Sequence, residues 1–239
     1  MGVHVLESAH IPLGSGDGLT CTRCAPAREA SYVPGTELEN RIRTVAEGWA
    51  GGPGPNIVLG GPEPFAHPEL PALVAACVAA GVERICLETD GGALSVPANA
   101  GGVLRAGVRH LRVRLLAGDA VLADELSGLR GRTGDALAGI DAFLEAADSD
   151  GARVTVTALV PVCQHNLASL PATVALLARH GLHAVRLIPG GSLPSGADSV
   201  LAAACDTGMV NQLWVEVDPA LPLPSSHALH AVPEEVRDV

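Results

Sequence analysis

Two cysteines three residues apart form the part of this sequence whose spacing most directly suits chemistry. Cys21 and Cys24 make a Cys-x-x-Cys hairpin, which is typical of metal-binding or redox-active thiol pairs. Two thiolates alone do not hold a metal ion, so further ligands are needed. Asp17 lies four residues before Cys21 and is a candidate for one of them.

Plainer interpretations of the same segment stay open. The two cysteines could be a structural pair without a metal, and Asp17 could be a turn residue between two glycines. A zinc site that adds His4 and His10 to the thiols is a further alternative, although it needs the chain to fold back on itself. The other cysteines, at 77, 86, 163 and 205, have no partner nearby in the sequence, and without a signal peptide we expect no disulfides.

Polar residues and glycines also follow each of three expected strands. The segment after 56–59 reads Gly60-Gly61-Pro62-Glu63-Pro64, the one after 84–88 contains Thr89 and Asp90, and Arg114 lies near the end of 110–115. The glycines let a ligand approach the backbone, and the prolines fix a turn that exposes carbonyls and a carboxylate. We expect Arg114 to pair with Glu88 or Asp90, either filling a pocket or anchoring an anionic substrate.

Short apolar strands alternate with Ala-rich helical segments along the chain, which predicts parallel strands joined by helical crossovers. In either a doubly wound sheet or a βα barrel, ligands bind at the carboxyl ends of the strands. The expected strands are 3–6 or 11–13, 56–59, 84–88, 110–115, 153–160, 184–188 and 213–217. The expected helices are 37–50, 68–80, 96–106, 135–147 and 167–180.

Taken together, the order of these motifs resembles the radical SAM superfamily over roughly residues 10–190. The matching features are a cysteine loop after the first strand, a Gly-Gly-Glu-Pro-like turn, a Thr-Asn-Gly-like turn and an Arg-Gly-x-x-Gly-like segment. They stand here as Cys21-Thr-Arg-Cys24, Gly60-Gly-Pro-Glu-Pro64, Thr89-Asp90-Gly91 and Arg130-Gly-Arg-Thr-Gly134.

This resemblance implies a partial (βα)6 TIM-like barrel with six core strands over residues 1–218 and a C-terminal tail over 219–239. It implies a 4Fe-4S cluster held by Asp17, Cys21 and Cys24, and S-adenosylmethionine held by the strand ends. In such enzymes one electron from the cluster cleaves S-adenosylmethionine and releases a 5′-deoxyadenosyl radical. The residues that the resemblance assigns to the cofactor are Gly60, Gly61, Glu63, Pro64, Thr89, Asp90 and Arg114.

The sequence departs from the family pattern where the chemistry would take place. Asp17 stands where the first cluster cysteine is expected, and a carboxylate is a harder ligand than iron–sulfur sites favour. We therefore favour a degenerate, non-catalytic partner subunit for a radical SAM enzyme in natural-product or peptide modification. The alternative is an active enzyme that binds the cluster and S-adenosylmethionine. No catalytic residue can be assigned.

The composition excludes some classes of binding partner. The 239 residues are 48% hydrophobic, which is enough to build a core, and carry 15 basic against 26 acidic groups, a net charge of −11. Such an acidic surface argues against nucleic acid. It could serve a basic peptide or a partner subunit, or serve solubility alone. The longest mostly apolar run, 70–82, is too short to cross a bilayer. We expect a cytoplasmic protein that binds no membrane.

Overall fold

The structure is a computed structural model, and it describes residues 8–16, 19–24, 28–49 and 54–227. Its centre is a curved sheet of seven strands, each parallel to its neighbours. The strands of this sheet are β1 (Ala9–Pro12), β4 (Asn56–Gly60), β5 (Arg84–Thr89), β6 (His110–Arg114), β7 (Thr155–Val162), β8 (Ala184–Pro189) and β9 (Trp214–Val217). A short antiparallel pair, β2 (Gly14–Ser15) and β3 (Ser31–Tyr32), lies apart from it.

The order of the strands distinguishes the two fold classes that the alternation allowed. Neighbours in the sheet follow the order of the chain from β1 to β9, whereas a doubly wound sheet reverses direction at a switch point. Within the described residues the end strands β1 and β9 do not pair, so the barrel is partial rather than closed. The predicted partial TIM-like barrel is confirmed, and the seventh expected strand, 213–217, joins the six core strands as β9.

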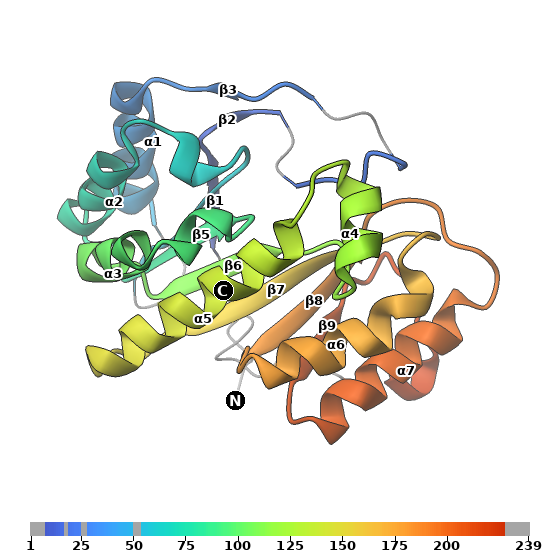
Figure 1. The fold of residues 1–239 in the computed structure, drawn as a ribbon. Helices are drawn as coiled ribbons and strands as arrows, with labels where there is room; N and C mark the ends of the chain where they lie inside the picture. Colours follow the sequence, from blue (N-terminus) through green and yellow to red (C-terminus); the bar gives the residue numbers. More distant parts are fainter. Residues whose placement is uncertain (1–7, 17–18, 25–27, 50–53, 228–239) are drawn as a thin grey trace.

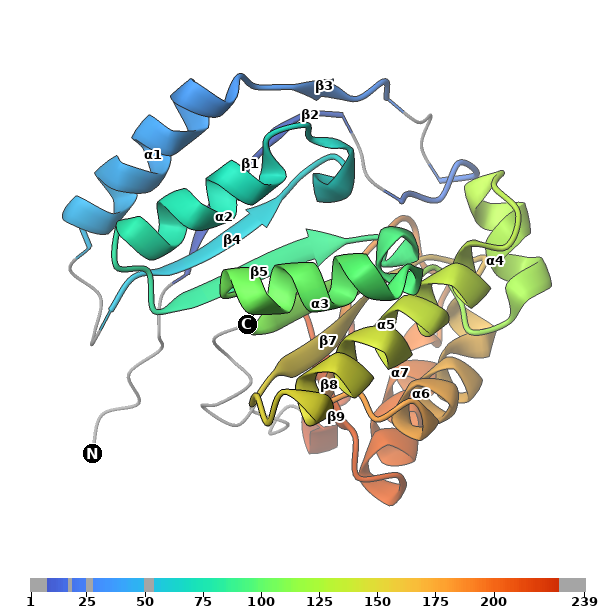
Figure 2. The ribbon, with the colours of Figure 1, turned by 60° about the vertical axis from the view of Figure 1, so that its left-hand side comes forward.

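A layer of helices covers the convex face of the sheet (Figures 1 and 2). Along this layer α1 packs against α2, α2 against α3, α3 against α5, and α6 against α7. The helices are α1 (Gly35–Glu47), α2 (Leu70–Ala79), α3 (Pro97–Ala106), α4 (Ala120–Ser127), α5 (Arg132–Ser149), α6 (Leu170–Arg179) and α7 (Ala197–Val210). Five of them match expected helices, whereas α4 and α7 were not predicted.

The two faces of the sheet differ in chemistry because successive side chains of a strand point to opposite faces. On β6, Leu111 and Val113 belong to the main hydrophobic core beneath the helices. Arg112 and Arg114 alternate with them and therefore lie on the concave face, beside Glu88 and Thr157 of the flanking strands. A parallel sheet covered by helices on both sides would be apolar on both. The charged concave face is thus where a ligand has polar partners.

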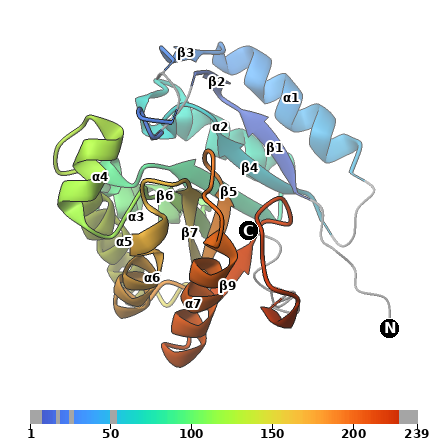
Figure 3. The same ribbon diagram turned by 90° about the vertical axis from the view of Figure 1, so that its right-hand side faces the viewer.

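The carboxyl ends of the strands gather at one rim of the sheet, where the antiparallel pair β2–β3 and α4 also lie (Figure 3). The predicted domain boundary at residue 218 stays a prediction. Leu221, just beyond it, is buried in the core, and residues 228–239 lie outside the described part. Of the helices in the described ranges, none is both long and apolar enough to span a bilayer.

Candidate cofactor and thiol site

The turn after β4 is cross-linked to the end of β5 through the carboxylate of Glu63. One oxygen of this carboxylate accepts hydrogen bonds from the Thr89 hydroxyl, at 2.6 Å, and from the Phe65 N–H, at 3.2 Å. The other accepts the Asp90 N–H at 2.7 Å. The turn begins at Gly61, whose φ of 98° favours glycine. The carboxylate that sequence analysis assigned to a cofactor is therefore already held by three donors of the chain.

Burial raises the pKa of the Glu63 carboxyl, and the nearby Asp90 charge adds to this, whereas the three hydrogen bonds oppose it. Tyr32 of β3 covers the same turn, because its hydroxyl donates to the Glu63 carbonyl at 2.9 Å. Burial, with the charges of Glu63 and Asp90, raises the pKa of this phenol, so Tyr32 remains a donor at neutral pH. Sequence analysis did not identify Tyr32.

Arg114 reaches from β6 to this turn. Its guanidinium donates to the Gly61 carbonyl at 2.6 Å and forms an ion pair with Glu88 at 3.1 Å. Both charged side chains are largely buried, with 13% and 16% of their surface exposed. The predicted pairing with Glu88 is confirmed. Asp90, the other expected partner, instead pairs with Arg132 at 3.2 Å.

Below this ion pair, the concave face carries polar atoms that have no hydrogen-bond partner among the described residues. They include the buried Nε atoms of Arg112 and Arg114 and the hydroxyl of Thr157, which is 5% exposed. Burial, with the charges of neighbouring arginines, lowers the pKa of His110 to about 4. Buried donors without partners are rare in proteins and commonly mark a place where water or a ligand binds.

The remaining site residues of the turn are positioned by backbone packing. Gly60 is the last residue of β4, and a Cβ there would lie 2.7 Å from Nε2 of His10 on β1. His10 is 3.9 Å from Glu88, and its pKa is lowered by burial and by Arg112 and Arg114, with Glu88 opposing them. Pro64 opens a short 3₁₀ turn, Pro64–Ala66. Gly60 and Pro64 thus shape the turn and offer no side-chain ligand.

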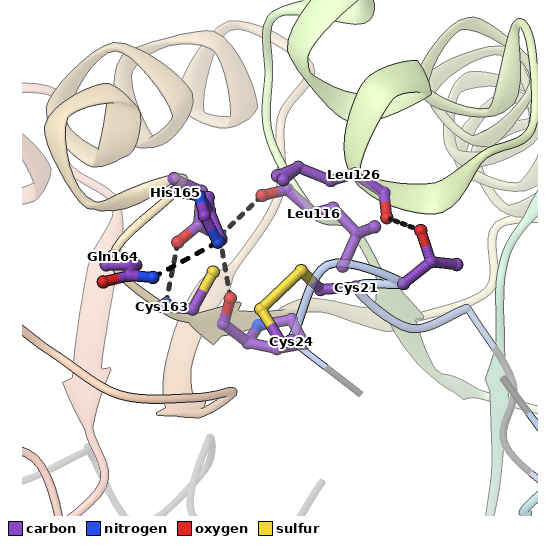
Figure 4. The surroundings of a disulfide bond; sticks show 10 residues. Cys21, Cys24, Leu116, Leu126, Cys163, Gln164 and His165 are labelled. Carbon is purple, nitrogen blue, oxygen red and sulfur yellow. Dashed lines mark hydrogen bonds between the residues drawn. A yellow bond between two sulfur atoms is a disulfide. The ribbon is translucent and has the colours of Figure 1, made fainter. Parts of the chain in front are cut away.

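A second cluster, of three sulfur atoms, lies above the ends of β6, β7 and β8. The structure joins Cys21 and Cys24 by a disulfide, with their Cα atoms 5.3 Å apart, so the expectation of no disulfide is wrong for this pair. Cys163, the first residue after β7, brings its sulfur to the same place, and the three Sγ atoms lie within 4.8 Å of one another (Figure 4). Asp17 lies outside the described residues, so its predicted role as a ligand stays a prediction.

Asn166 fixes the position of Cys163. Its amide oxygen accepts the Cys163 N–H at 2.9 Å, and its amide nitrogen donates to the carbonyls of Leu116 and Pro161, both at 2.7 Å. Asn166 precedes the 3₁₀ turn Leu167–Ser169, and its side chain makes no capping bond to that turn because it is used in these three contacts.

The N-terminal loop is held against α4. The N–H and the hydroxyl of Thr22 both donate to the Leu126 carbonyl, at 2.7 and 2.9 Å. Arg23 pairs with Glu125 at 3.3 Å on the surface. On the opposite side Gly191 lies so close that a Cβ there would be 3.1 Å from Cys163 Cβ and 3.4 Å from Cys24 Sγ. Three separate segments thus enclose the sulfur atoms.

Cys163 was not expected at this site from the sequence. The strand before it was expected at 153–160 and is found at Thr155–Val162, so the cysteine directly follows a strand end. Position at a carboxyl end of a parallel strand was the signal that could have identified it.

Comparisons with known proteins place this geometry in a structural class. No protein-family model matches the sequence, and no curated protein is similar to it. Among solved structures, SuiB of Streptococcus suis superposes with a TM-score of 0.66 at 13% identity, covering 87% of this chain and 48% of SuiB. Native anSMEcpe with bound AdoMet superposes with a TM-score of 0.62 at 14% identity, covering 87% of this chain and 63% of anSMEcpe. Methylornithine synthase (PylB) superposes with a TM-score of 0.62 at 14% identity, covering 90% of this chain and 65% of PylB. The chain has the radical SAM fold.

The match extends over most of this chain but over only about half to two thirds of each of these proteins. SuiB has also been solved bound to S-adenosylmethionine, and bound to its precursor peptide SuiA. At these low identities the likeness concerns the fold, and the chemistry of this chain has to be judged from its own residues.

The two clusters suit the cofactors of radical SAM enzymes unequally. Three thiols are the soft donors that iron–sulfur and zinc centres use, so Cys21, Cys24 and Cys163 fit a metal centre once the disulfide is reduced. The turn after β4 fits S-adenosylmethionine poorly. Its acceptors, the carbonyls of Gly61 and Glu63 and the Glu63 carboxylate, already receive hydrogen bonds from the chain.

Proposed function

We propose that this chain is a radical SAM-like protein that does not itself catalyse a radical reaction and works as a partner subunit for a radical SAM enzyme in natural-product or peptide modification. The observation that carries this proposal is the position of Arg114. The family resemblance assigns the turn after β4 to the methionine amino group, which is a cation. Here another cation, the Arg114 guanidinium, donates to the Gly61 carbonyl and pairs with the buried Glu88.

Displacing Arg114 would be costly. Cofactor binding would require the guanidinium to leave Gly61, and Glu88 would then lose its closest cationic partner. Breaking a buried ion pair by removing one partner costs about 3–5 kcal/mol. Tyr32 and Thr89 hold the remaining acceptors of the turn, so a second set of hydrogen bonds would have to be exchanged as well.

A partner subunit needs a surface for its ligand, and the concave face supplies one. The unpartnered donors of Arg112 and Thr157 suit a carboxylate of a bound peptide, because both are buried and held on adjacent strands. A peptide role agrees with SuiB, which has been solved with its precursor peptide. The net charge of −11 also favours a basic partner for the outer surface.

One observation favours the alternative, an active enzyme. Cys163 gives the site a third thiol next to Cys21 and Cys24, so that a cluster would not depend on Asp17. A bound 4Fe-4S cluster would supply the electron that cleaves S-adenosylmethionine. The thiols would hold such a cluster, but Arg114 would still have to release Gly61 before the second cofactor could bind.

Binding of S-adenosylmethionine separates the two functions. We expect no binding to the reduced, anaerobic wild-type protein by equilibrium dialysis up to millimolar cofactor, and no 5′-deoxyadenosine when dithionite is added. The double variant Arg114→Met/Glu88→Gln frees the Gly61 carbonyl and leaves no unpaired carboxylate at position 88. The matched control is Arg41→Met, which removes an exposed arginine that pairs with Glu37 on α1.

Binding and reductive cleavage by the wild-type protein would overturn the proposed function in favour of the enzyme. A partner role also predicts that the chain raises the turnover of a radical SAM enzyme on its peptide substrate when the three are mixed. Arg112→Met should lower that increase, because it removes a donor of the concave face.

A further inference from the structure

The three sulfur atoms come from two segments far apart in the chain. Their arrangement suits a metal site that does not require S-adenosylmethionine. We propose that Cys21, Cys24 and Cys163 bind one thiophilic divalent ion, zinc, with the third ligand supplied by the carboxyl end of β7. A water molecule completes the coordination. Within the described ranges, no other group of metal-binding side chains of this kind comes together.

The three sulfur atoms are close enough to reach a single ion once the disulfide is reduced. They lie within 4.8 Å of one another while Cys21 and Cys24 are still bonded. Zinc–thiolate bonds of about 2.3 Å in a tetrahedron place the sulfurs about 3.8 Å apart, so the bonded pair would have to separate on reduction. A four-iron cluster instead spreads its thiolates over different iron atoms, and the family resemblance places those ligands at 17, 21 and 24, in one loop. The third thiol of this site comes from elsewhere in the fold.

The local backbone is ready to bind an ion when the disulfide is reduced. The Cys24 N–H donates to the Cys21 carbonyl at 2.9 Å, which closes the tight turn that Cys-x-x-Cys metal hairpins require. A dithiol reductant such as dithiothreitol supplies two electrons and two protons to the S–S bond and becomes the cyclic disulfide. The ion then displaces one proton from each of the three thiols, so its affinity rises with pH.

Cys163 is held as a ligand should be. Asn166 makes three hydrogen bonds around it. Figure 4 shows the Cys163 sulfur facing the pair. Metal sites depend on such supporting contacts. The absence of a side chain at Gly191 allows the segment after β8 to lie close to Cys163 and Cys24.

The surroundings also explain why a metal would be useful here. The sulfurs lie in a small cluster separate from the main core, in which Leu116 and Leu126 are the large buried side chains. Thr22 adds two hydrogen bonds between the loop and α4. So little apolar surface gives little stability, and a bound ion would join the N-terminal loop, α4 and the end of β7.

The test uses the full chain, purified without oxygen in dithiothreitol, stripped with a chelator and titrated with Co²⁺. We expect one Co²⁺ per chain, with thiolate charge-transfer absorbance in the near ultraviolet, and displacement by one equivalent of Zn²⁺. Cys163→Ala should weaken binding at least 10-fold and reduce the charge-transfer intensity by about a third. Cys205→Ala, which removes a buried thiol in α7, should leave both unchanged.

Circular dichroism of the stripped proteins shows whether Cys163→Ala still folds, and Cys163→Ser, which keeps the size of the side chain, serves if it does not. Unaltered Co²⁺ binding by the Cys163 variants would overturn the proposal, as would a reduced wild-type protein that binds no Co²⁺. Uptake of about four irons per chain with sulfide, equal in wild type and Cys163→Ser, would place the ligands in the N-terminal loop and overturn it as well. None of these outcomes depends on whether S-adenosylmethionine binds, so the proposed function and the metal site fail separately.

Discussion

The turn after β4 and the sulfur cluster lie at the same rim of the sheet but differ in how their polar atoms are used. At the turn, Glu63 and the Gly61 carbonyl already accept hydrogen bonds from Thr89, Asp90 and Arg114. At the sulfur cluster, three soft donors meet within 4.8 Å, and two of them form a disulfide. Under the proposals above, the first region holds no cofactor and the second holds a metal ion.

This difference indicates that the two regions depend on different residues. Arg114 donates to the turn at Gly61 and pairs with Glu88. Cys163 brings a third sulfur to Cys21 and Cys24. The fold positions one region at the ends of β4 to β6 and the other at the ends of β6 to β8, so β6 is the strand that the two regions share.

The largest loss of stability is expected on the sulfur side, from a change at Asn166. Asn166→Ala removes three buried hydrogen bonds and leaves the carbonyls of Leu116 and Pro161 without these donors. We expect a loss of about 3–4 kcal/mol in the free energy of unfolding, measured in urea. Asn99→Ala is the control, because Asn99 is exposed and donates one hydrogen bond. Equal effects of the two variants would contradict a special role for Asn166.

The second largest loss of stability is expected at the turn, from a change at Arg114. Arg114→Met leaves Glu88 without its partner at 3.1 Å. It should cost about 2–3 kcal/mol, below the loss for a fully buried pair, because 13% and 16% of the two side chains remain exposed to water. Adding Glu88→Gln removes the unpaired charge, so the double variant should be more stable than Arg114→Met alone. A double-mutant cycle from urea unfolding measures the coupling between the two residues, and purely additive effects would show that the pair is not linked.

The charged concave face below the turn should make stability depend on pH through His110. Its pKa is lowered to about 4 in the folded state, mainly by burial. As pH falls below about 6.5, the unfolded chain gains the proton before the folded protein does, so stability falls between about pH 6.5 and pH 4. We expect this to account for about 2 kcal/mol and His110→Gln to remove it. Parallel stability curves for wild type and His110→Gln over this range would refute the assignment.

The smallest effect is expected at Gly191, on the sulfur side. A Cβ there would press on Cys163 at 3.1 Å, so Gly191→Ala should cost about 1 kcal/mol and shift the Co²⁺ spectrum. Gly134 in α5 has no heavy atom within 4 Å of the position of a Cβ, and Gly134→Ala should be neutral or slightly stabilising. If Gly191→Ala behaves like this control, the enclosure of the sulfurs is looser than the structure describes.

The regular part of the fold could be predicted from the sequence because it repeats. Alternating apolar strands and Ala-rich helices define a parallel sheet, and neighbouring strand ends in such a sheet must meet. That is why the pairing of Arg114 with Glu88 could be anticipated: the two residues lie on adjacent strands.

The sulfur cluster could not be predicted in the same way. Cys163 directly follows β7, which ends two residues later than expected. Cys21 and Cys24 come close to it because the loop 19–24 packs on α4, a helix that was not predicted. Neither the exact strand end nor the path of a loop leaves a periodic pattern in the sequence. The contact of Tyr32 with the turn could not be predicted for the same reason, because its hydroxyl reaches the Glu63 carbonyl from the short β2–β3 pair.

The distance along the chain between Cys163 and the N-terminal pair has a consequence for folding. Contacts between segments far apart in sequence form late, because the intervening loop must first be closed. During synthesis, Cys21 and Cys24 emerge long before β7 and β8, the strands whose ends complete their surroundings. The crossovers from β4 to β6 can pack first, whereas the N-terminal loop gains its partners only when the later part of the barrel is in place. We therefore expect amide protons of the loop 19–24 to become protected last in refolding.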